Sequence, residues 1–194
     1  MITLGEFSLE RTIRAVEKVR ERLLRATAIL EKANIPYAVA GGNAVAAWVS
    51  RVDEAAVRFT QDVDIVLRRS DFPAAIAAFE AAGFQHAQIL GVEVFLDGPS
   101  AKSRDSVHVV FAKERVKPGD ESETPDIDRF QIADTYRIVE LESLVRMKLT
   151  AFRDKDRTHL RDMIGVGLID STWPARFAPA LGTRLQELLD NPEG

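Results

Sequence analysis

The chain has 194 residues, a formal net charge of −4 at pH 7 and no cysteine, and a chain of this length usually forms one domain, or one domain with a small appendage. The lack of cysteine excludes disulfides and thiolate metal sites, and it fits a reducing compartment. Charges appear early in the first residues and no apolar run reaches the roughly 20 residues of a membrane helix, so we expect a cytoplasmic protein without a secretory signal or a membrane partner.

The first half of the chain alternates between helical and extended patterns. Apolar residues recur at helical spacing over residues 8–33, with Ser8 as the expected N-cap, and Asn34 and Pro36 end this predicted helix. The elements expected next are a strand, a helix, a second strand and a second helix, at residues 37–40, 43–49, 63–67 and 71–82. Gly83 follows the last of them, where a glycine commonly ends a helix.

The second half begins with strands and ends with helices. Strands are predicted at residues 84–90, 92–96 and 107–112, a polar loop at 113–128, a short stretch at 130–139, and helices at 140–153, 156–166 and 176–189. This order predicts an α/β (α+β) fold, in which a small mixed sheet is flanked by an N-terminal helix and a C-terminal helical region. We divide the chain into a core at residues 1–139 and a helical region at 140–194 that completes the site.

Two aspartates stand at the start of the predicted strand 63–67, whose other residues are apolar. Residues two apart in a strand point to the same face, so we expect Asp62 and Asp64 to lie side by side. Two such charges about 5 Å apart repel by roughly 3 kcal/mol at an effective dielectric near 20. A divalent cation would offset this repulsion, and paired carboxylates suit Mg²⁺. The alternative is a strand end washed by solvent, because a D-x-D pattern alone is a weak signal.

A glycine pair precedes the aspartates along the chain. Gly41 and Gly42 follow the predicted strand 37–40 and lead into the predicted helix, with Asn43 directly after them. Glycine lets the backbone approach a ligand closely, and a helix start offers N–H groups and a positive dipole end that suit phosphate. Alone, the pair indicates a tight turn. Together with the aspartates, it predicts a triphosphate held between a turn and a metal ion.

These residues resemble the nucleotidyltransferase superfamily of the polymerase-β type, and within it small bacterial members such as the AbiEii-like toxins and the minimal nucleotidyltransferases. The glycine pair is followed by Arg58-Phe-Thr60-Gln-Asp62-Val-Asp64, which is similar to the R-x-T-x-D-x-D strand of the family, and the resemblance covers roughly residues 37–165. It implies a nucleotidyltransferase core in which the two aspartates hold Mg²⁺ or Mn²⁺. It further implies a set of nucleotide-binding residues: Gly41, Gly42, Asn43, Arg58 and Thr60.

A basic segment follows in the second half. Its cations are Arg146, Lys148, Arg153, Lys155, Arg157 and Arg161. The segment is either a solvated helix face or an anion site. Lys148 lies one turn from Leu144 and Phe152 on an apolar face, so it either extends to solvent along its stem or meets an anion. The resemblance implies that Lys148 and Arg153 act on the nucleotide phosphates.

The end of this segment resembles the last motif of the family, R-x-K-D-x-x-D. In the related toxins the final acid of this motif is proposed to help activate the acceptor. Two residues of this chain can take that position, Asp162 and His159. The sequence leaves both open.

A third carboxylate, which the superfamily usually supplies from a later strand, is missing from the expected place. The polar face of the predicted strand 107–112 offers His108 instead. Imidazole is a poor ligand for Mg²⁺, so His108 is either a general base on the acceptor hydroxyl or a structural histidine. Asp105 and Glu93 are the other acids that could serve.

The leading hypothesis is transfer of an NMP from an NTP to an acceptor hydroxyl, with Mg²⁺. The acceptor is an RNA or tRNA end, a small molecule or a protein, and the resemblance implies a toxin with an antitoxin partner or a role in phage defence. The alternative is a non-catalytic nucleotide-binding or interaction module of the same fold. The predicted catalytic residues are Asp62, Asp64, Lys148, His108 and Asp162.

Overall fold

The computed structural model describes residues 9–98, 101 and 105–192, and the structural statements below concern these residues. Its helices are α1 (Leu9–Lys32), α2 (Gly41–Ser50), α3 (Phe72–Ala81), α4 (Leu141–Ala151), α5 (Asp154–Gly165) and α6 (Pro179–Asp190). Its strands are β1 (Ala38–Ala40), β2 (Val63–Leu67), β3 (Gln85–Ile89), β4 (Val92–Leu96), β5 (Ser106–Phe111), β6 (Phe130–Ala133) and β7 (Tyr136–Val139). The fold is thus of the predicted α/β class.

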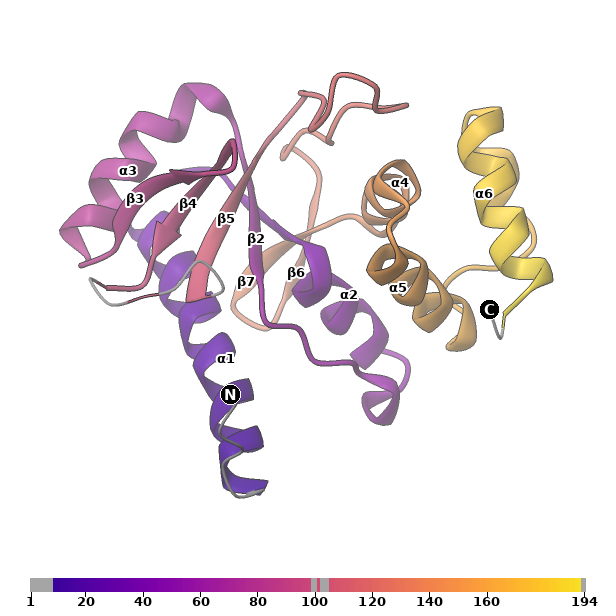
Figure 1. The fold of residues 1–194 in the computed structure, drawn as a ribbon, viewed down its shortest axis with the longest axis horizontal. Coiled ribbons are helices and arrows are strands. Elements are labelled where there is room, and N and C mark those ends of the chain that lie inside the picture. The colour runs from indigo at the N-terminus through magenta and orange to yellow at the C-terminus, as the bar shows by residue number, and fades with distance from the viewer. Residues whose placement is uncertain (1–8, 99–100, 102–104, 193–194) are drawn as a thin grey trace, which may run out of the picture.

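The described strands form one mixed sheet with the order β3-β4-β5-β2-β1-β7-β6. Strand β2 runs parallel to β5 and β1 runs parallel to β7, whereas the other neighbours are antiparallel. Figure 1 shows β2 and β5 crossing the middle of the molecule. In this register Asp64 is paired with His108 on one side and with Ala40 on the other. The end of β1, just before the glycine pair, is therefore adjacent to the aspartate strand.

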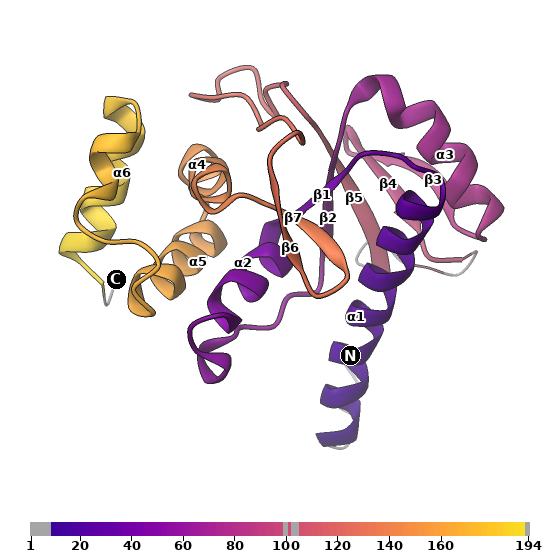
Figure 2. The ribbon, with the colours of Figure 1, turned by 180° about the vertical axis from the view of Figure 1, so that it is seen from behind.

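Helices α1 and α3 pack on one face of the sheet. Phe79 of α3 stacks on Phe95 of β4 with ring centroids 4.0 Å apart, and Leu23 and Leu30 of α1 are buried in the same core. Figure 2 shows the second half of α1 against the sheet, while its first turns project beyond it. The apolar stripe of α1 explains this placement, because only that side of an amphipathic helix gains from burial.

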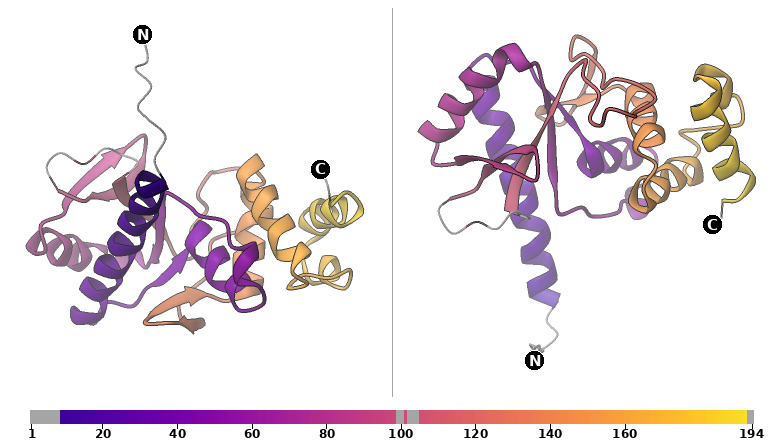
Figure 3. Two further views of the ribbon diagram at one scale, coloured as in Figure 1. Left: turned by 90° about the horizontal axis from the view of Figure 1, so that it is seen from below. Right: turned by 45° about the horizontal axis from the view of Figure 1, so that its top comes forward.

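Helices α4, α5 and α6 form a group away from α1 and α3, as both views in Figure 3 show. Helix α4 ends at Ala151, short of the predicted Arg153, because Phe152 adopts a left-handed φ of 45°. Arg184 of α6 donates to the last main-chain carbonyls of α4. A helix end leaves such carbonyls without partners inside the helix, so Arg184 stabilises this corner between α4 and α5.

Other boundaries also differ from the predictions by a few residues. Helix α2 begins at Gly41 rather than Asn43, so the glycine pair forms the first turn of the helix and not a separate turn before it. The stretch 130–139, to which the sequence assigned no type, forms the hairpin of β6 and β7. The N-cap predicted at Ser8 lies outside the described residues. Among the helices of the described part of the chain, none has the length and apolar character needed to cross a membrane.

Candidate functional site

The start of helix α2 lies directly against the segment that carries the aspartates. Gly41 has a φ of 63°, and a Cβ added there would lie 1.8 Å from Oδ2 of Asp64. A Cβ added at Gly42 would lie 2.6 Å from Oγ1 of Thr60. Neither approach leaves room for a side chain, and the left-handed backbone at Gly41 favours glycine independently. The structure therefore brings four of the predicted site residues together.

Asn43 ties the same helix to the residue before β2. Its side-chain amide donates a hydrogen bond to the main-chain carbonyl of Asp62 at 2.7 Å. The N-cap residue of α2, Ala40, has no side chain that could cap the helix. The main-chain N–H groups of the first turn, together with the helix dipole, favour a negative group at this end.

Asp64 and His108 form a cross-strand pair in the middle of the sheet. Nδ1 of His108 lies 3.3 Å from Oδ1 of Asp64. Burial acts to raise the pKa of the Asp64 carboxyl, but the hydrogen bond from His108, with the charges of Lys148 and Lys155, holds this pKa below its usual value. Asp64 is therefore an ionised carboxylate at neutral pH, as a metal ligand must be.

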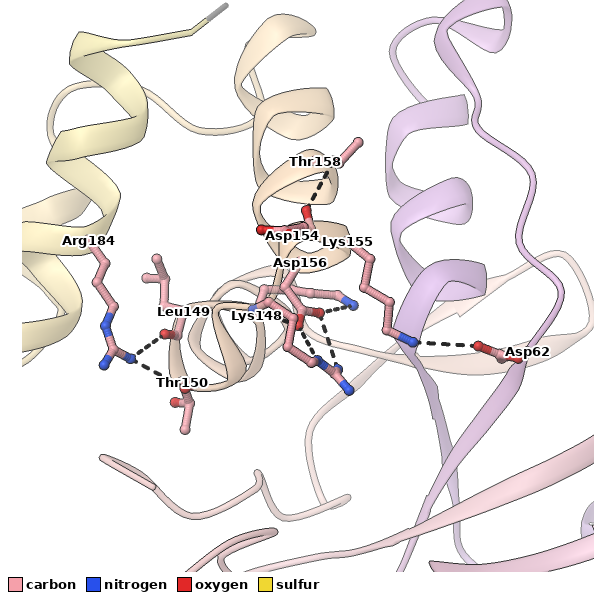
Figure 4. Close-up of polar contacts among 10 residues, drawn as sticks. Asp62, Lys148, Leu149, Thr150, Asp154, Lys155, Asp156, Thr158 and Arg184 are labelled. Carbon is pink, nitrogen blue, oxygen red and sulfur yellow. Dashed lines mark hydrogen bonds and ion pairs between the residues drawn. The ribbon is translucent and has the colours of Figure 1, made fainter. Parts of the chain in front are cut away.

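Asp62 lies immediately before β2 and faces Lys155 of α5. Nζ of Lys155 is 3.5 Å from Oδ2 of Asp62, and Figure 4 shows this side chain reaching across from α5. Both side chains are partly exposed, so solvent weakens the pair. Because the charge of Lys155 also lowers the pKa of Asp64, this lysine lies near both predicted metal ligands.

Lys148 does not extend to solvent but meets an anion, which is a carboxylate of the next helix. Its Nζ lies 2.9 Å from Oδ1 of Asp156, and both side chains are buried. Arg153 binds the other oxygen of Asp156, with its Nε 2.7 Å from Oδ2. This hydrogen bond raises the pKa of Arg153, and the negative charges of Asp64 and Asp62 raise it further. Arg153 therefore lies within electrostatic range of the aspartates.

Arg58 and Asp162, predicted for nucleotide binding and for catalysis, bind each other. Nε and Nη2 of Arg58 lie 2.9 and 3.0 Å from the two carboxylate oxygens of Asp162. This bidentate pair joins the segment before β2 to α5. Asp162 is thus held at the site by the arginine of the R-x-T-x-D-x-D motif.

His159, the other residue considered for the last acidic position, is a neutral group. Its Nδ1 is buried and has no hydrogen-bond partner among the described residues. Burial and the charge of Lys148 lower the pKa of His159 to about 4. A neutral imidazole carries no negative charge at pH 7, so of the two residues only Asp162 supplies an acid.

The two other acids considered as a third carboxylate bind different partners. Glu93 contacts Nε2 of His86 at 2.6 Å, and Asp105 accepts a hydrogen bond from Arg22 of α1 at 3.3 Å. These contacts engage both carboxylates with side chains outside the predicted site. His108 therefore remains the residue that β5 presents to Asp64.

The donor set of Asp62 and Asp64 fits a hard divalent cation. Carboxylate oxygens are preferred ligands of Mg²⁺ and Mn²⁺, and Mg²⁺ usually completes its shell with waters and substrate phosphates. Over the described ranges, no group of three or more His, Asp or Glu side chains is arranged to hold a metal ion. A metal at this site would thus take its remaining ligands from water and from a phosphate.

Comparisons with known proteins bear on the fold. No protein-family model matches the chain. No curated protein matches it either. Among solved structures, it is similar to an antigenic nucleotidyltransferase-like protein from Paracoccidioides brasiliensis, with 17% identity, a TM-score of 0.52, and coverage of 91% of this chain and 89% of that chain. It is also similar to the antibiotic-resistance factor ANT(2'')-Ia in solution, with 13% identity, a TM-score of 0.50, and coverage of 93% and 90%.

These likenesses define the class of fold. The mixed sheet with helices before and after it matches the core of a nucleotidyltransferase-like protein. The fold class predicted from the sequence is therefore confirmed. At such low identities the likeness shows the fold alone, and the chemistry must be argued from the residues of this chain.

Two residues near the site, Lys155 and Asp156, were given no role of their own, although they are the lysine and the aspartate of the segment that resembles the motif R-x-K-D-x-x-D. The sequence carried a partial signal for Asp156, because Arg153 and Asp156 are three residues apart and such residues are neighbours at a helix start. No local signal pointed to the contact of Asp156 with Lys148, since a corner of the chain lies between them. Lys155 was one cation of the basic segment and the lysine of that motif, and neither pattern pointed to its contact with Asp62.

Proposed function

We propose that the protein is a nucleotidyltransferase that transfers an NMP from an NTP to an acceptor hydroxyl, with Mg²⁺ or Mn²⁺ bound by Asp62 and Asp64. One observation carries the proposal: the backbone of Gly41 passes so close to the Asp64 carboxylate that no side chain fits between them. This approach places the start of α2, with its N–H groups, directly beside the carboxylate that would hold the metal.

Each group has a role in binding the triphosphate. The N–H groups at the start of α2 face the phosphates, and Thr60, packed against Gly42, fixes the segment that leads into β2. The metal ion, when bound, would neutralise charge on the phosphate oxygens and polarise the α-phosphate. Lys155 and Arg153 supply positive charge on the opposite side, from α5 and its N-cap. Positioning and electrostatic stabilisation account for most of such catalysis.

The proposed reaction is an in-line displacement at the α-phosphorus. The acceptor oxygen forms a bond to the α-phosphorus while the bond from this phosphorus to the bridging oxygen breaks, and pyrophosphate leaves with that oxygen. The hydroxyl proton passes to a general base, for which His108 beside Asp64 is our candidate. Negative charge that builds on the pyrophosphate is offset by Arg153 and Lys155.

The direct test is transfer of label from an α-labelled NTP. The purified protein is incubated with Mg²⁺ or Mn²⁺ and in turn with RNA, a small-molecule acceptor set and a protein lysate. Asp64→Asn should abolish the transfer, whereas Asp154→Asn, which removes an exposed carboxylate from the first turn of α5, should leave it intact. Equal labelling by wild type and Asp64→Asn, or none with any acceptor, would contradict the proposal.

A second candidate function is a nucleotide-binding module without catalysis. The specific observation in its favour is that β5 presents His108, and not a third carboxylate, to Asp64. Equilibrium dialysis with labelled NTP separates the two functions. Binding that persists unchanged in EDTA, with no transfer to any acceptor, would favour the module.

The acceptor and the biological role are finer proposals. One of the two similar structures is an antibiotic-resistance factor, and this likeness supports a small molecule as the acceptor. The other is a nucleotidyltransferase-like protein and does not bear on the acceptor. The support for a toxin role with an antitoxin partner is the resemblance of the R-x-T-x-D-x-D segment to the AbiEii-like toxins. Its test is induction of the wild-type chain and of Asp64→Asn in a bacterial host, where only the wild type should arrest growth.

A further inference from the structure

Two cations that the sequence assigned to the nucleotide converge on one buried carboxylate. Asp156 is 1% exposed, and its Oδ1 lies 2.9 Å from Nζ of Lys148, which is 7% exposed. Its Oδ2 lies 2.7 Å from Nε of Arg153. Figure 4 shows Lys148 and Asp156 side by side where α4 meets α5. The same carboxylate therefore holds the charged ends of both Lys148 and Arg153 in place.

The same carboxylate also fixes the main chain at this corner. Arg153 is the N-cap of α5, and its main-chain N–H donates to Oδ2 of Asp156 at 3.3 Å. Phe152, with its left-handed φ of 45°, turns the chain from α4 into α5. The position of the Arg153 side chain and the start of α5 thus depend on one group.

Three charges in this cluster leave a net positive charge that faces the aspartates. Lys148 lowers the pKa of Asp64, and the negative charges of Asp64 and Asp62 raise the pKa of Arg153. The cluster is therefore in electrostatic range of the candidate metal ligands. Without Asp156, two cations with long side chains would be drawn towards those aspartates or towards solvent.

We propose that Asp156 is a positioning residue, which holds Lys148 and Arg153 at the distance from Asp62 and Asp64 that a bound triphosphate needs. The inference rests on the proposed function. Asp156 touches no substrate; it acts through the two cations. The competing interpretation is a buried ion pair that only stabilises the corner between α4 and α5.

The test compares Asp156→Asn and Asp156→Glu with the control Asp154→Asn. Asp156→Asn keeps the size of the side chain and removes the charge. We expect its KM for NTP to rise about tenfold or more, with a smaller loss in kcat, while Asp154→Asn stays near wild type. An unchanged KM in a folded Asp156→Asn variant would overturn the inference.

Asp156→Glu distinguishes positioning from mere stabilisation, and it answers the question if Asp156→Asn fails to fold. Glutamate keeps the charge and suits this position of a capped helix start, but it moves the carboxylate by one methylene. We expect a melting temperature near that of the wild type together with a raised KM for NTP. If Asp156→Glu instead has both the melting temperature and the KM for NTP of the wild type, the inference is overturned. A wild type that binds no NTP would instead show that the proposed function itself has failed.

Discussion

Asp64 and His108 lie opposite each other on the parallel strands β2 and β5, with Nδ1 of the ring 3.3 Å from a carboxylate oxygen. The pair places a proton acceptor beside the candidate metal ligand. His108 also stands on β5 at the position where a third carboxylate was expected. If His108 accepts a proton during the reaction, the site is catalytic. If it only replaces the third carboxylate as a structural residue, the site binds nucleotide without transferring it.

The first prediction concerns His108 as the general base. His108→Asn keeps a polar side chain of similar shape but cannot accept the acceptor proton. We expect the rate of transfer at saturating NTP to fall about 100-fold, because general-base catalysis typically contributes 10²–10⁴-fold. The affinity for NTP should change little. If His108→Asn instead retains its rate, the histidine is structural and another group takes the proton.

The second prediction concerns the close approach of Gly41. In Gly41→Ala the new methyl group would lie 1.8 Å from Oδ2 of Asp64, at a φ of 63° that disfavours alanine. We expect the free energy of unfolding to fall by more than the roughly 1–2 kcal/mol of left-handed strain alone, and NTP binding to be lost.

Gly167→Ala is the matched control for Gly41→Ala. Gly167 has a φ of 77°, but an added Cβ there meets nothing within 4 Å. It therefore reports the backbone strain without the clash, and NTP binding should be retained. Denaturant unfolding and NTP titration on both variants check the pair. Equal losses of stability, with binding intact in both, would show that Asp64 adapts to a side chain at residue 41.

The third prediction concerns the bidentate pair of Arg58 and Asp162. Arg58 is more than half exposed, so the pair should stabilise the fold by only about 0.5–1 kcal/mol in a double-mutant cycle. If Asp162 acts by holding Arg58, then Arg58→Gln, Asp162→Asn and the double variant should lower transfer to the same extent. A much larger loss in Asp162→Asn alone would give the carboxylate a direct part in the reaction.

The fourth prediction concerns the pH dependence of stability. The pKa of His159 is lowered from 6.5 to about 4 in the folded protein, so the unfolded chain binds a proton at this residue more readily. Its contribution to stability is therefore present above pH 6.5 and is lost as the pH falls towards 4. By linkage the loss is at most about 3 kcal/mol.

In His159→Gln the free energy of unfolding should therefore fall less than in the wild type as the pH is lowered, by up to about 3 kcal/mol. Chemical denaturation of wild type and variant between pH 7.5 and 4.5 measures the difference. Besides burial, the charges of Lys148 and Lys155 lower the pKa of His159, whereas those of Asp156 and Asp162 raise it. Parallel pH profiles for the two proteins would mean that His159 titrates normally in the folded state.

Much of the fold follows from signals that are local in the sequence. Helical spacing, alternation and Gly83 place most elements to within a few residues, because these patterns reflect which side of each element is buried. The end of α4 was missed because the residue that turns the chain is Phe152, and a left-handed phenylalanine has no sequence signature. The strand order was also beyond the sequence, since β1 and β7 pair across a long separation.

The site divides in the same way. The closeness of Gly41 to Asp64 could be predicted, because a strand, a glycine pair and a second strand lie near each other in the chain. The partner of Arg58 could not, since Asp162 is 104 residues away. Nor could the burial of Lys148 against Asp156, which depends on the corner between α4 and α5.

The central claim is that Asp62 and Asp64 hold a divalent ion together with an NTP at the start of α2. Thermal unfolding with NTP tests it, measured with Mg²⁺ and with EDTA. A ligand at 100 times its dissociation constant adds about 2.7 kcal/mol, or roughly 5–10 °C for a chain of this size. We expect this rise for the wild type only with Mg²⁺, and no rise for Asp62→Asn or Asp64→Asn. An equal rise in all three proteins, or a wild-type rise that persists in EDTA, would contradict it.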